Sequence, residues 1–293
     1  SYDPVGNVAS IPYPNGVISS FTYDDVNPLT RIEHRQGATT LAADDYKLDA
    51  GGRRLRVDHV SGDSVSFSYD SADRLLQETH RNASGVVIFE QTFTYDDVGN
   101  RLTQQITGQA RTVLAYDSAD KLLIAGSTTF AYDANGRLIS KTAPLGTVSY
   151  VYDVEGQLLR VTTSTGTVTY AYDAMGKRRV RIGNGSEQNF LLDEASLTGF
   201  DQTLVAFDDS DNQLVEYHWG DRLISADDGR SDRFFHADAS SNIRWLTDEL
   251  GTASDTIDYD AFGNVRDRTG PADSPYGFAG EWQEEAEGLV FLR

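Results

Sequence analysis

The chain contains no cysteine, a single methionine and only seven prolines among its 293 residues. Without cysteine, disulfides and thiolate chemistry are excluded. Basic residues are scarce beside acidic ones, with 25 Lys and Arg against 45 Asp and Glu, which gives a formal net charge of −20. Such a chain repels phosphates, so we expect no nucleic-acid binding. No run approaches the length of about 18 apolar residues that would span a bilayer, so we expect no membrane insertion.

Helix signals and catalytic motifs are equally scarce. No window of a dozen residues carries an apolar stripe at 3.6-residue spacing, and the best helical candidate, Glu281 to Gly288, is expected to be a loop or one turn. The five histidines form no His-Glu-x-x-His motif, and no Gly-x-Ser-x-Gly elbow occurs. Paired acids such as Asp208-Asp209 have no predicted cleft to hold them. We therefore name no catalytic residue, no metal ligand and no cofactor, and we expect the chain not to be an enzyme.

The acidic excess is unevenly distributed. Residues 1–192 have a net charge of −4, whereas residues 193–293 have a net charge of −16. A solubilising surface explains this excess most simply. An acidic face that docks a basic partner is the sharper alternative. Calcium in acid-rich turns is a weaker alternative, because no Asp-x-Asp-x-Asp-Gly loop with a trailing Glu is found.

The dipeptide Tyr-Asp recurs along the chain and is its most informative feature. From Tyr95 to Tyr172 the steps between copies are 21, 16, 20 and 20 residues. A Gly, Asp or Asn usually stands three residues after the Asp, as in YDANGRLI (132–139) and YDVEGQLL (152–159). A period near twenty indicates one small structural unit repeated many times.

The sequence of the repeat predicts a β-hairpin. In residues 146–163, Val148, Tyr150 and Tyr152 alternate with small or polar residues, which predicts a strand. Asp153 suits the first position of a turn, where its carboxylate accepts backbone N–H groups, and Gly156 suits the positive φ that ends a type I turn with a bulge. Because tyrosine exceeds phenylalanine, 15 against 13, we expect half-buried rings with hydroxyls in water.

These patterns predict an all-β fold of consecutive antiparallel hairpins. About thirteen hairpins of two strands each are expected. Residues 46–55, 207–214 and 235–246 are degenerate copies that keep the turn. We divide the chain into a hairpin array, 1–192, and a segment of degenerate repeats, 193–293, continuous with it. Because the chain opens inside a repeat and stops inside an apparent strand, we interpret it as a fragment of a longer array.

The Tyr-Asp-x-x-Gly-x-Leu unit resembles the YD repeat of the Rhs family. The segment FFHADASSNIRWLTDELGTASDTIDYDAFGNV (234–265) is similar to that family's core segment, and PYGFAGEWQEEAEGLVFLR (275–293) is similar to the segment that follows it. The candidate core-segment positions are His236, Trp245, Gly280 and Trp282. The structural repeat positions are Tyr23, Asp24, Tyr69, Asp70, Tyr95, Asp96, Gly99, Tyr116, Asp117, Tyr132, Asp133, Gly136, Tyr152, Asp153, Gly156, Tyr172, Asp173, Gly176, Tyr259, Asp260 and Gly263.

The resemblance implies a fold and a role. In Rhs polymorphic toxins, in the C subunits of insecticidal Tc toxins and in teneurins, such repeats wind as a spiral sheet into a hollow shell. In the toxins, this shell encloses the C-terminal part of the same polypeptide. The expected function is therefore the wall of a shell around a toxin or effector of the same parent chain, in a secreted, exported or cell-surface protein. Other shell or delivery proteins are further expected partners. The family's self-cleavage segment would lie downstream of Arg293.

Two other functions compete with the shell wall. An extracellular recognition or adhesion module that binds glycan or protein would show a local aromatic patch, whereas a wall around cargo would show a continuous apolar lining. An enzyme or scaffold built on a β-propeller is the third hypothesis, because two hairpins of this length would make one blade. Identical odd and even copies count against the propeller.

Overall fold

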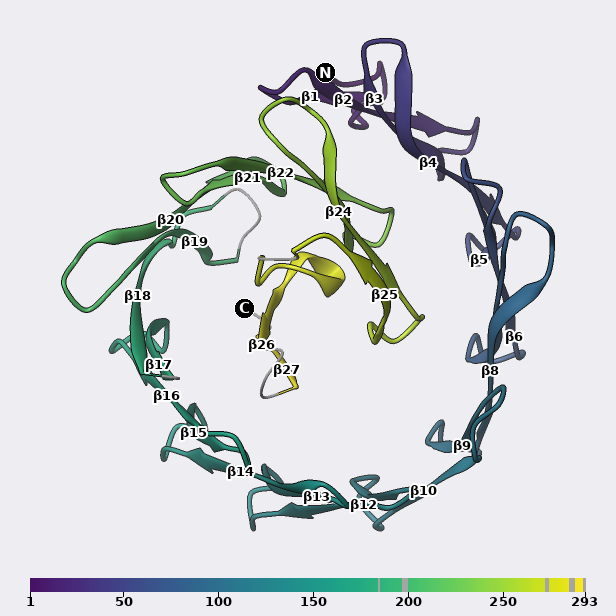
Figure 1. Cartoon of the computed structure of the whole chain (residues 1–293). Helices are drawn as coiled ribbons and strands as arrows, with labels where there is room; N and C mark the ends of the chain where they lie inside the picture. The colour runs from purple at the N-terminus through teal and green to yellow at the C-terminus, as the bar shows by residue number, and fades with distance from the viewer. Residues whose placement is uncertain (184, 197–199, 272–273, 285–287, 292–293) are drawn as a thin grey trace. The chain divides into compact units, whose positions relative to one another are not determined.

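The protein is described by a computed structural model that covers residues 1–183, 185–196, 200–271, 274–284 and 288–291. In these residues, strands and turns account for the chain apart from one 3₁₀ turn, η1 (Phe278–Gly280). Each strand pairs antiparallel with the next along runs of successive hairpins (Figure 1). The predicted all-β class built from consecutive antiparallel hairpins is confirmed.

The chain divides into two compact units. The first comprises Ser1–Arg111 and Arg233–Gly280, and the second comprises Thr112–Asp232 and Glu281–Arg293. The boundary expected between residues 192 and 193 stays a prediction.

The first unit contains two runs of paired strands and η1. The first run, in which neighbours in sequence pair with one another, is β1 (Ser10–Pro12), β2 (Val17–Tyr23), β3 (Leu29–Gln36), β4 (Thr39–Leu48), β5 (Arg54–His59), β6 (Ser64–Tyr69), β7 (Leu75–Arg81), β8 (Val87–Tyr95) and β9 (Arg101–Ile106). The second run is β22 (Asp232–Ala237), β23 (Ile243–Thr247), β24 (Ala253–Tyr259) and β25 (Val265–Thr269).

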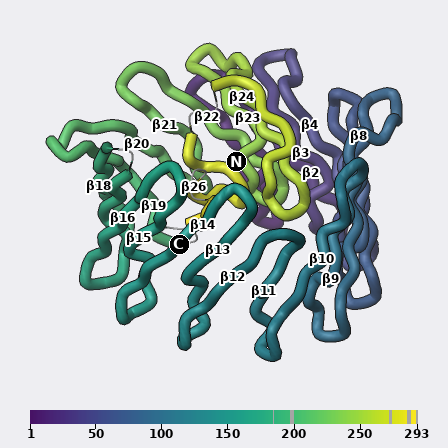
Figure 2. Tube along the Cα trace, turned by 60° about the horizontal axis from the view of Figure 1, so that its bottom comes forward, coloured from purple at the N-terminus to yellow at the C-terminus, as the bar shows by residue number. Residues whose placement is uncertain are grey.

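The second unit is one long run of hairpins with a short separate hairpin. Figure 2 follows the trace through the successive strands from β10 to β15. The run is β10 (Thr112–Tyr116), β11 (Leu122–Ala125), β12 (Thr128–Tyr132), β13 (Leu138–Ala143), β14 (Gly146–Tyr152), β15 (Leu158–Thr162), β16 (Thr167–Tyr172), β17 (Arg178–Gly183), β18 (Ser186–Asp193), β19 (Gln202–Phe207), β20 (Gln213–Trp219) and β21 (Leu223–Asp227).

The separate hairpin is β26 (Trp282–Glu284) with β27 (Leu289–Phe291). The expectation of a loop or helical turn over 281–288 is therefore wrong for β26. Trp282 and Glu284 are buried on either side of Gln283, which is the period of a strand, and both find buried partners that local sequence does not reveal.

One turn closes the repeat hairpins. In the copy at Asp133, its amide donates to the Arg137 carbonyl, its Oδ1 accepts from the amides of Asn135 and Arg137, and Gly136 takes φ +81°. Positive φ at this position also occurs in residues with side chains, among them Asn27, Asp73 and Ser241. Asn and Asp tolerate the left-handed region better than most residues other than glycine. Two backbone hydrogen bonds, from the Asp amide to the carbonyl four residues later and from the amide three residues later to the Asp carbonyl, also occur at Asp3, Asp24, Asp49, Asp70, Asp96, Asp117, Asp153, Asp173, Asp208, Asp238, Asp248 and Asp260.

The alternation along each strand gives the sheet two faces. We call the face with the repeat tyrosines and the following leucines the tyrosine face; in β14 it carries Tyr150 and Tyr152. The opposite threonine face carries cross-strand hydroxyl pairs such as Thr142–Thr147, at 3.0 Å, and Thr162–Thr167, at 3.3 Å. The contrast is clear between neighbours, since Tyr150 is 6% exposed and Val151 is 39% exposed.

Each unit has its core on the tyrosine face. In the first unit Phe21, Ile32, Tyr46 and Val57 form a buried cluster. In the second unit the buried cluster consists of Tyr150, Val161, Val168 and Tyr170. A single-layered sheet buries these residues by packing side chains of adjacent strands against one another and by receiving later segments of the chain on this face.

Candidate functional site

The repeat tyrosines tie each hairpin to the one before it. The Tyr152 hydroxyl donates to the Leu138 carbonyl at 3.0 Å, and the Tyr172 hydroxyl donates to the Leu158 carbonyl at 3.0 Å. The acceptor is the backbone of the leucine that follows the preceding turn. The rings are half-buried as expected, but these hydroxyls do not end in water. The same bond joins Tyr23 to Val8, Tyr69 to Arg54, Tyr95 to Leu75 and Tyr132 to Leu122.

A basic residue four positions after the repeat Asp completes the link. Arg137 donates through Nε to Asp133 at 2.6 Å, donates to the Asp153 carbonyl at 2.7 Å, and lies over the Tyr152 ring at 5.3 Å. Donation by the Arg137 amide, with further hydrogen bonds, lowers the pKa of Asp133. Arg74 repeats these contacts with Asp70, Asp96 and Tyr95. In both copies these contacts join neighbouring hairpins rather than converge on one pocket.

The core-segment residues are placed differently. His236 and Trp245 are cross-strand partners in β22 and β23, and both rings meet His34 of β3, with centroids 5.0 Å and 5.2 Å away. Gly280 ends η1 with φ +71°. Trp282 lies in the second unit, edge-on to Phe190 at 5.4 Å. Tyr259 is buried and Asp260 closes the β24–β25 turn.

Residues 233–280 dock on the strands of the first unit. The Tyr13 hydroxyl donates to the Phe235 carbonyl at 3.0 Å, and the Tyr46 hydroxyl accepts from the Ala239 amide at 3.1 Å. Glu78 accepts from the Ala261 amide at 3.0 Å. These partners are about two hundred residues apart in sequence, which explains why sequence patterns did not reveal the contact.

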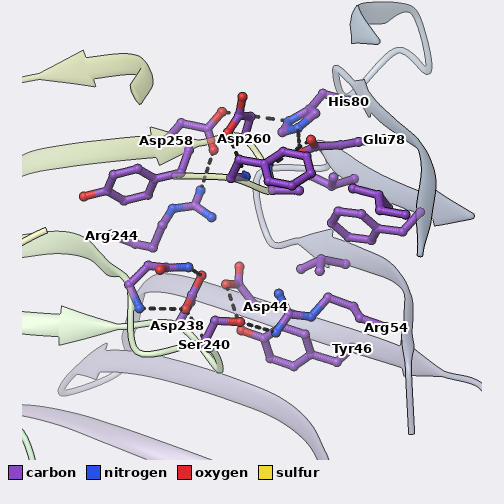
Figure 3. Close-up of a pocket in the computed structure, with 18 of the residues that line it drawn as sticks. Asp44, Tyr46, Arg54, Glu78, His80, Asp238, Ser240, Arg244, Asp258 and Asp260 are labelled. Carbon is purple, nitrogen blue, oxygen red and sulfur yellow. Dashed lines mark hydrogen bonds and ion pairs between the residues drawn. The ribbon is translucent and has the colours of Figure 1, made fainter. Parts of the chain in front are cut away.

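A cavity of about 510 Å³, lined by charged and apolar side chains, lies at this docking surface (Figure 3). Acidic side chains enter it from both segments: Asp44 and Glu78 from the repeat strands, and Asp238, Asp258 and Asp260 from the docked segment. Two cations, Arg54 and Arg244, and the imidazole of His80 also line it. Apolar lining comes from Val57, Phe67, Leu75, Phe262 and Phe278.

The two acids from the repeat strands, Asp44 and Glu78, accept hydrogen bonds that favour their ionised forms. Burial raises the pKa of Glu78, but donation by His80, by the Ala261 amide and by Gln91 outweighs it, so that the pKa lies below its ordinary value. Burial likewise raises the pKa of Asp44, and its hydrogen bond with His59 outweighs that effect and lowers the pKa. Asp258 binds Arg244 at 2.9 Å and Arg266 at 2.6 Å. Carboxylates stabilised in this way fasten two segments together and are poor general acids.

A second docking contact lies in the second unit. Arg178 of β17 is buried and donates to Glu284 of β26 at 2.9 Å, and the Arg181 Nε donates to the other carboxylate oxygen at 2.7 Å. The Arg178 guanidinium lies 3.9 Å from the centroid of Phe291 and 5.6 Å from that of Trp282. The sequence analysis missed Arg178; the run Lys177-Arg178-Arg179 beside a Tyr-Asp turn is its only local signal.

Two kinds of feature are not found in the described parts of the chain, a group of metal-binding side chains and a membrane-spanning helix. Among these residues, no three His, Cys, Asp or Glu side chains are grouped so that they could hold a metal ion. No helix there is long and apolar enough to cross a membrane.

Comparison with known proteins gives a consistent result. The family model described as Teneurin YD-shell matches residues 89–293. The tRNA3(Ser)-specific nuclease WapA of Bacillus spizizenii and the tRNA nuclease WapA of Bacillus subtilis are each 30% identical over 99% of the chain. The chain spans only 12% of the length of either relative.

Solved structures show the same fold. The complex TcdB2-TccC3-Cdc42 matches 99% of the chain and 19% of its own, with a TM-score of 0.53 and 14% identity. The Photorhabdus luminescens Tc holotoxin pore matches 99% of the chain and 19% of its own, with a TM-score of 0.53 and 15% identity.

Proposed function

Since the chain belongs to the teneurin YD-shell family, we propose that it forms part of a shell wall that encloses a C-terminal effector of the same polypeptide. In this proposal the wall is structural, not enzymatic, and the protein is exported from the cell that makes it. The observation that supports this proposal most is that, in both units, later parts of the chain pack on the tyrosine face. Residues 233–280 cover Tyr46 and His34 in the first unit, and β26–β27 covers Tyr170 and Phe190 in the second.

The rest of the tyrosine face in the second unit suits the same use. Phe130, Leu138 and Val148 are only half-buried on strands β12, β13 and β14. Leu138 and Val148 extend the buried cluster around Tyr150 along the sheet. These half-buried apolar side chains support the proposal, because an enclosed polypeptide would gain burial for its own apolar groups there.

The nuclease activity named for the WapA relatives would, in this proposal, belong to the enclosed segment. A net charge of −20 opposes binding of a phosphate backbone by the wall itself. In the first unit's cavity, the carboxylates that enter from both segments likewise disfavour phosphate.

The test is protease protection of the full-length polypeptide. The purified native protein is digested with a nonspecific protease, and surviving peptides are mapped by mass spectrometry before and after denaturation. The matched control is the segment downstream of Arg293, expressed alone and digested identically. We expect the downstream segment to survive only when it is attached to the native wall. Equal digestion in both forms would refute enclosure and favour an extracellular recognition module.

A further inference from the structure

The dipeptide Asn-Gly occurs at three places in the sequence, Asn15, Asn135 and Asn184, of which the last lies outside the described residues. Asn15 lies in the turn between β1 and β2, and Asn135 lies in the turn between β12 and β13. Glycine has no side chain, so its amide nitrogen can approach the carboxamide of the preceding asparagine and attack it. Both described copies therefore have the same intrinsic route to the loss of ammonia.

The two turns have the same backbone geometry. In the first, the Tyr13 amide donates to the Val17 carbonyl at 2.8 Å and the Gly16 amide donates to the Tyr13 carbonyl at 3.0 Å. In the second, the Asp133 turn described above, the same two bonds measure 2.9 Å and 3.0 Å. The glycine φ is +82° at Gly16 and +81° at Gly136. The backbone alone therefore gives no reason for the two asparagines to react at different rates.

The side chains of the two asparagines differ in their surroundings. Nδ2 of Asn15 donates to the Thr247 hydroxyl and to the Asp248 carbonyl, both at 2.8 Å, although these residues are 232 and 233 positions away. Its Oδ1 accepts from the Val17 amide at 3.2 Å. Because the carbonyl oxygen of Asp248 cannot donate, the nitrogen of Asn15 must be the group that faces it. Asn15 therefore ties the β1–β2 turn to the docked segment, whereas Asn135 is exposed.

From this geometry we propose that Asn15 is a modification site that records whether residues 233–280 have left the first strands. In the reaction the Gly16 nitrogen forms a bond to Cγ of Asn15, the Cγ–Nδ2 bond breaks, and ammonia leaves with the proton of the Gly16 amide. Water then opens the resulting succinimide ring to give aspartate or isoaspartate. In the docked chain the Asn15 carboxamide must first give up both hydrogen bonds to the docked segment, so the reaction proceeds in chains that have opened.

Conversion of Asn15 weakens renewed docking of the segment. The aspartate product is ionised at neutral pH and accepts hydrogen bonds without donating any, so its carboxylate would face the Asp248 carbonyl with no proton between them. The isoaspartate product has the same charge and adds a methylene group to the backbone of the turn. Because ammonia has been lost, closing of the segment does not reverse the change, and the wall keeps a permanent record of having opened.

The first test compares the two asparagines within one wild-type sample. The 293-residue chain is incubated at pH 8.0, and the conversion of Asn15 and Asn135 is followed by peptide mass spectrometry. Each rate is divided by the rate of the same residue in a urea-unfolded sample, which removes the effect of the neighbouring sequence. We expect this ratio to be about 30-fold lower for Asn15, because two hydrogen bonds must break before it reacts. Equal ratios would overturn the proposal.

Hydrogen exchange provides the second test, which measures the effect of conversion on docking. Asn15→Asp should lower the protection of β23 and β24 about 30-fold, whereas the matched control Asn135→Asp should leave it unchanged. Unchanged protection of β12 to β16 shows that the variants fold. If Asn15→Asp fails to fold, wild-type chain converted in urea and then refolded gives the same comparison. Wild-type protection of β23 and β24 in the converted chain would overturn the proposal.

Discussion

Replacing Tyr152 with alanine tests whether the repeat tyrosines hold successive hairpins together. Its ring is half-buried between β13 and β15, its hydroxyl donates to the Leu138 carbonyl, and Arg137 lies over it. Tyr152→Ala removes all three contacts, whereas Tyr152→Phe removes only the hydrogen bond. Val151→Ala is the matched control, because its side chain lies next in sequence but on the threonine face.

The expected magnitudes follow from these contacts. Full truncation of a core aromatic costs about 3–5 kcal/mol, and half-burial reduces this to about 2. The hydroxyl contributes about 1 kcal/mol and the guanidinium about 0.5–1, partly overlapping with ring burial. We therefore expect a loss of about 2–3 kcal/mol for Tyr152→Ala, about 1 for Tyr152→Phe, and less than about 0.5 for Val151→Ala.

Hydrogen exchange measures this local effect, since a chain of this length need not unfold in one step. Amides of β13 to β15 should exchange about 30- to 150-fold faster in Tyr152→Ala and about fivefold faster in Tyr152→Phe. Exchange in the first unit should stay unchanged. If Tyr152→Ala exchanged no faster than Val151→Ala, the repeat tyrosine would not stabilise the hairpin junction and the reasoning would be refuted.

Three further predictions address other contacts. Gly263→Ala should destabilise the first unit by about 2–4 kcal/mol, because φ is +84° and a Cβ would lie 2.5 Å from the Phe278 ring. The control Gly156→Ala, where φ is +92° and the added Cβ meets open space, should destabilise its turn by only about 1–2 kcal/mol. Local hydrogen exchange measures both effects. Glu284→Gln should destabilise β26–β27 docking by about 3–5 kcal/mol, because Arg178 stays buried without its counter-charge. We expect faster proteolysis of the chain after β25 in this variant. Unchanged cleavage would contradict the prediction. Repeat turns such as that at Asp133 should persist down to about pH 4 and weaken below it. The pKa of Asp133 is lowered in the folded chain, so its ionised form stabilises the turn, and this stabilisation is lost as the pH falls below the ordinary aspartate pKa. Turn amides that lose protection near pH 6 would contradict this.

The hairpins could be predicted because their causes are local. Strand alternation, the aspartate that accepts backbone N–H groups and a residue that tolerates positive φ all lie within about eight residues of one another. The degenerate copies illustrate this, since Asp49, Asp208 and Asp238 form the same turn without a preceding Tyr. The resemblance to the YD-repeat family rested on the same local pattern.

The docking contacts could not be predicted because they join distant segments. Arg178 and Glu284 are 106 residues apart, and Glu78 and Ala261 are 183 apart. Nothing near Glu284 in sequence distinguishes a buried ion-pair partner from a surface acid. The error over 281–288 has the same origin, because β26 is held by the strands on which it packs. The tyrosine hydroxyls were expected in water for a similar reason, since their acceptors belong to the preceding hairpin.

The bond from a repeat tyrosine to a backbone carbonyl just after the preceding turn has a consequence for how such proteins change over evolutionary time. At such a junction the hairpin with the tyrosine carries the donor and its predecessor offers the acceptor, so inserting or deleting one copy of this kind leaves the neighbouring junctions chemically complete. The acceptor is a backbone carbonyl, which any residue supplies, and the turn accepts Gly, Asn, Asp or Ser at its constrained position. Gene duplication can therefore lengthen the array in whole hairpins without matching mutations elsewhere, and copies can differ in length, as the unequal spacing between Tyr95 and Tyr172 illustrates.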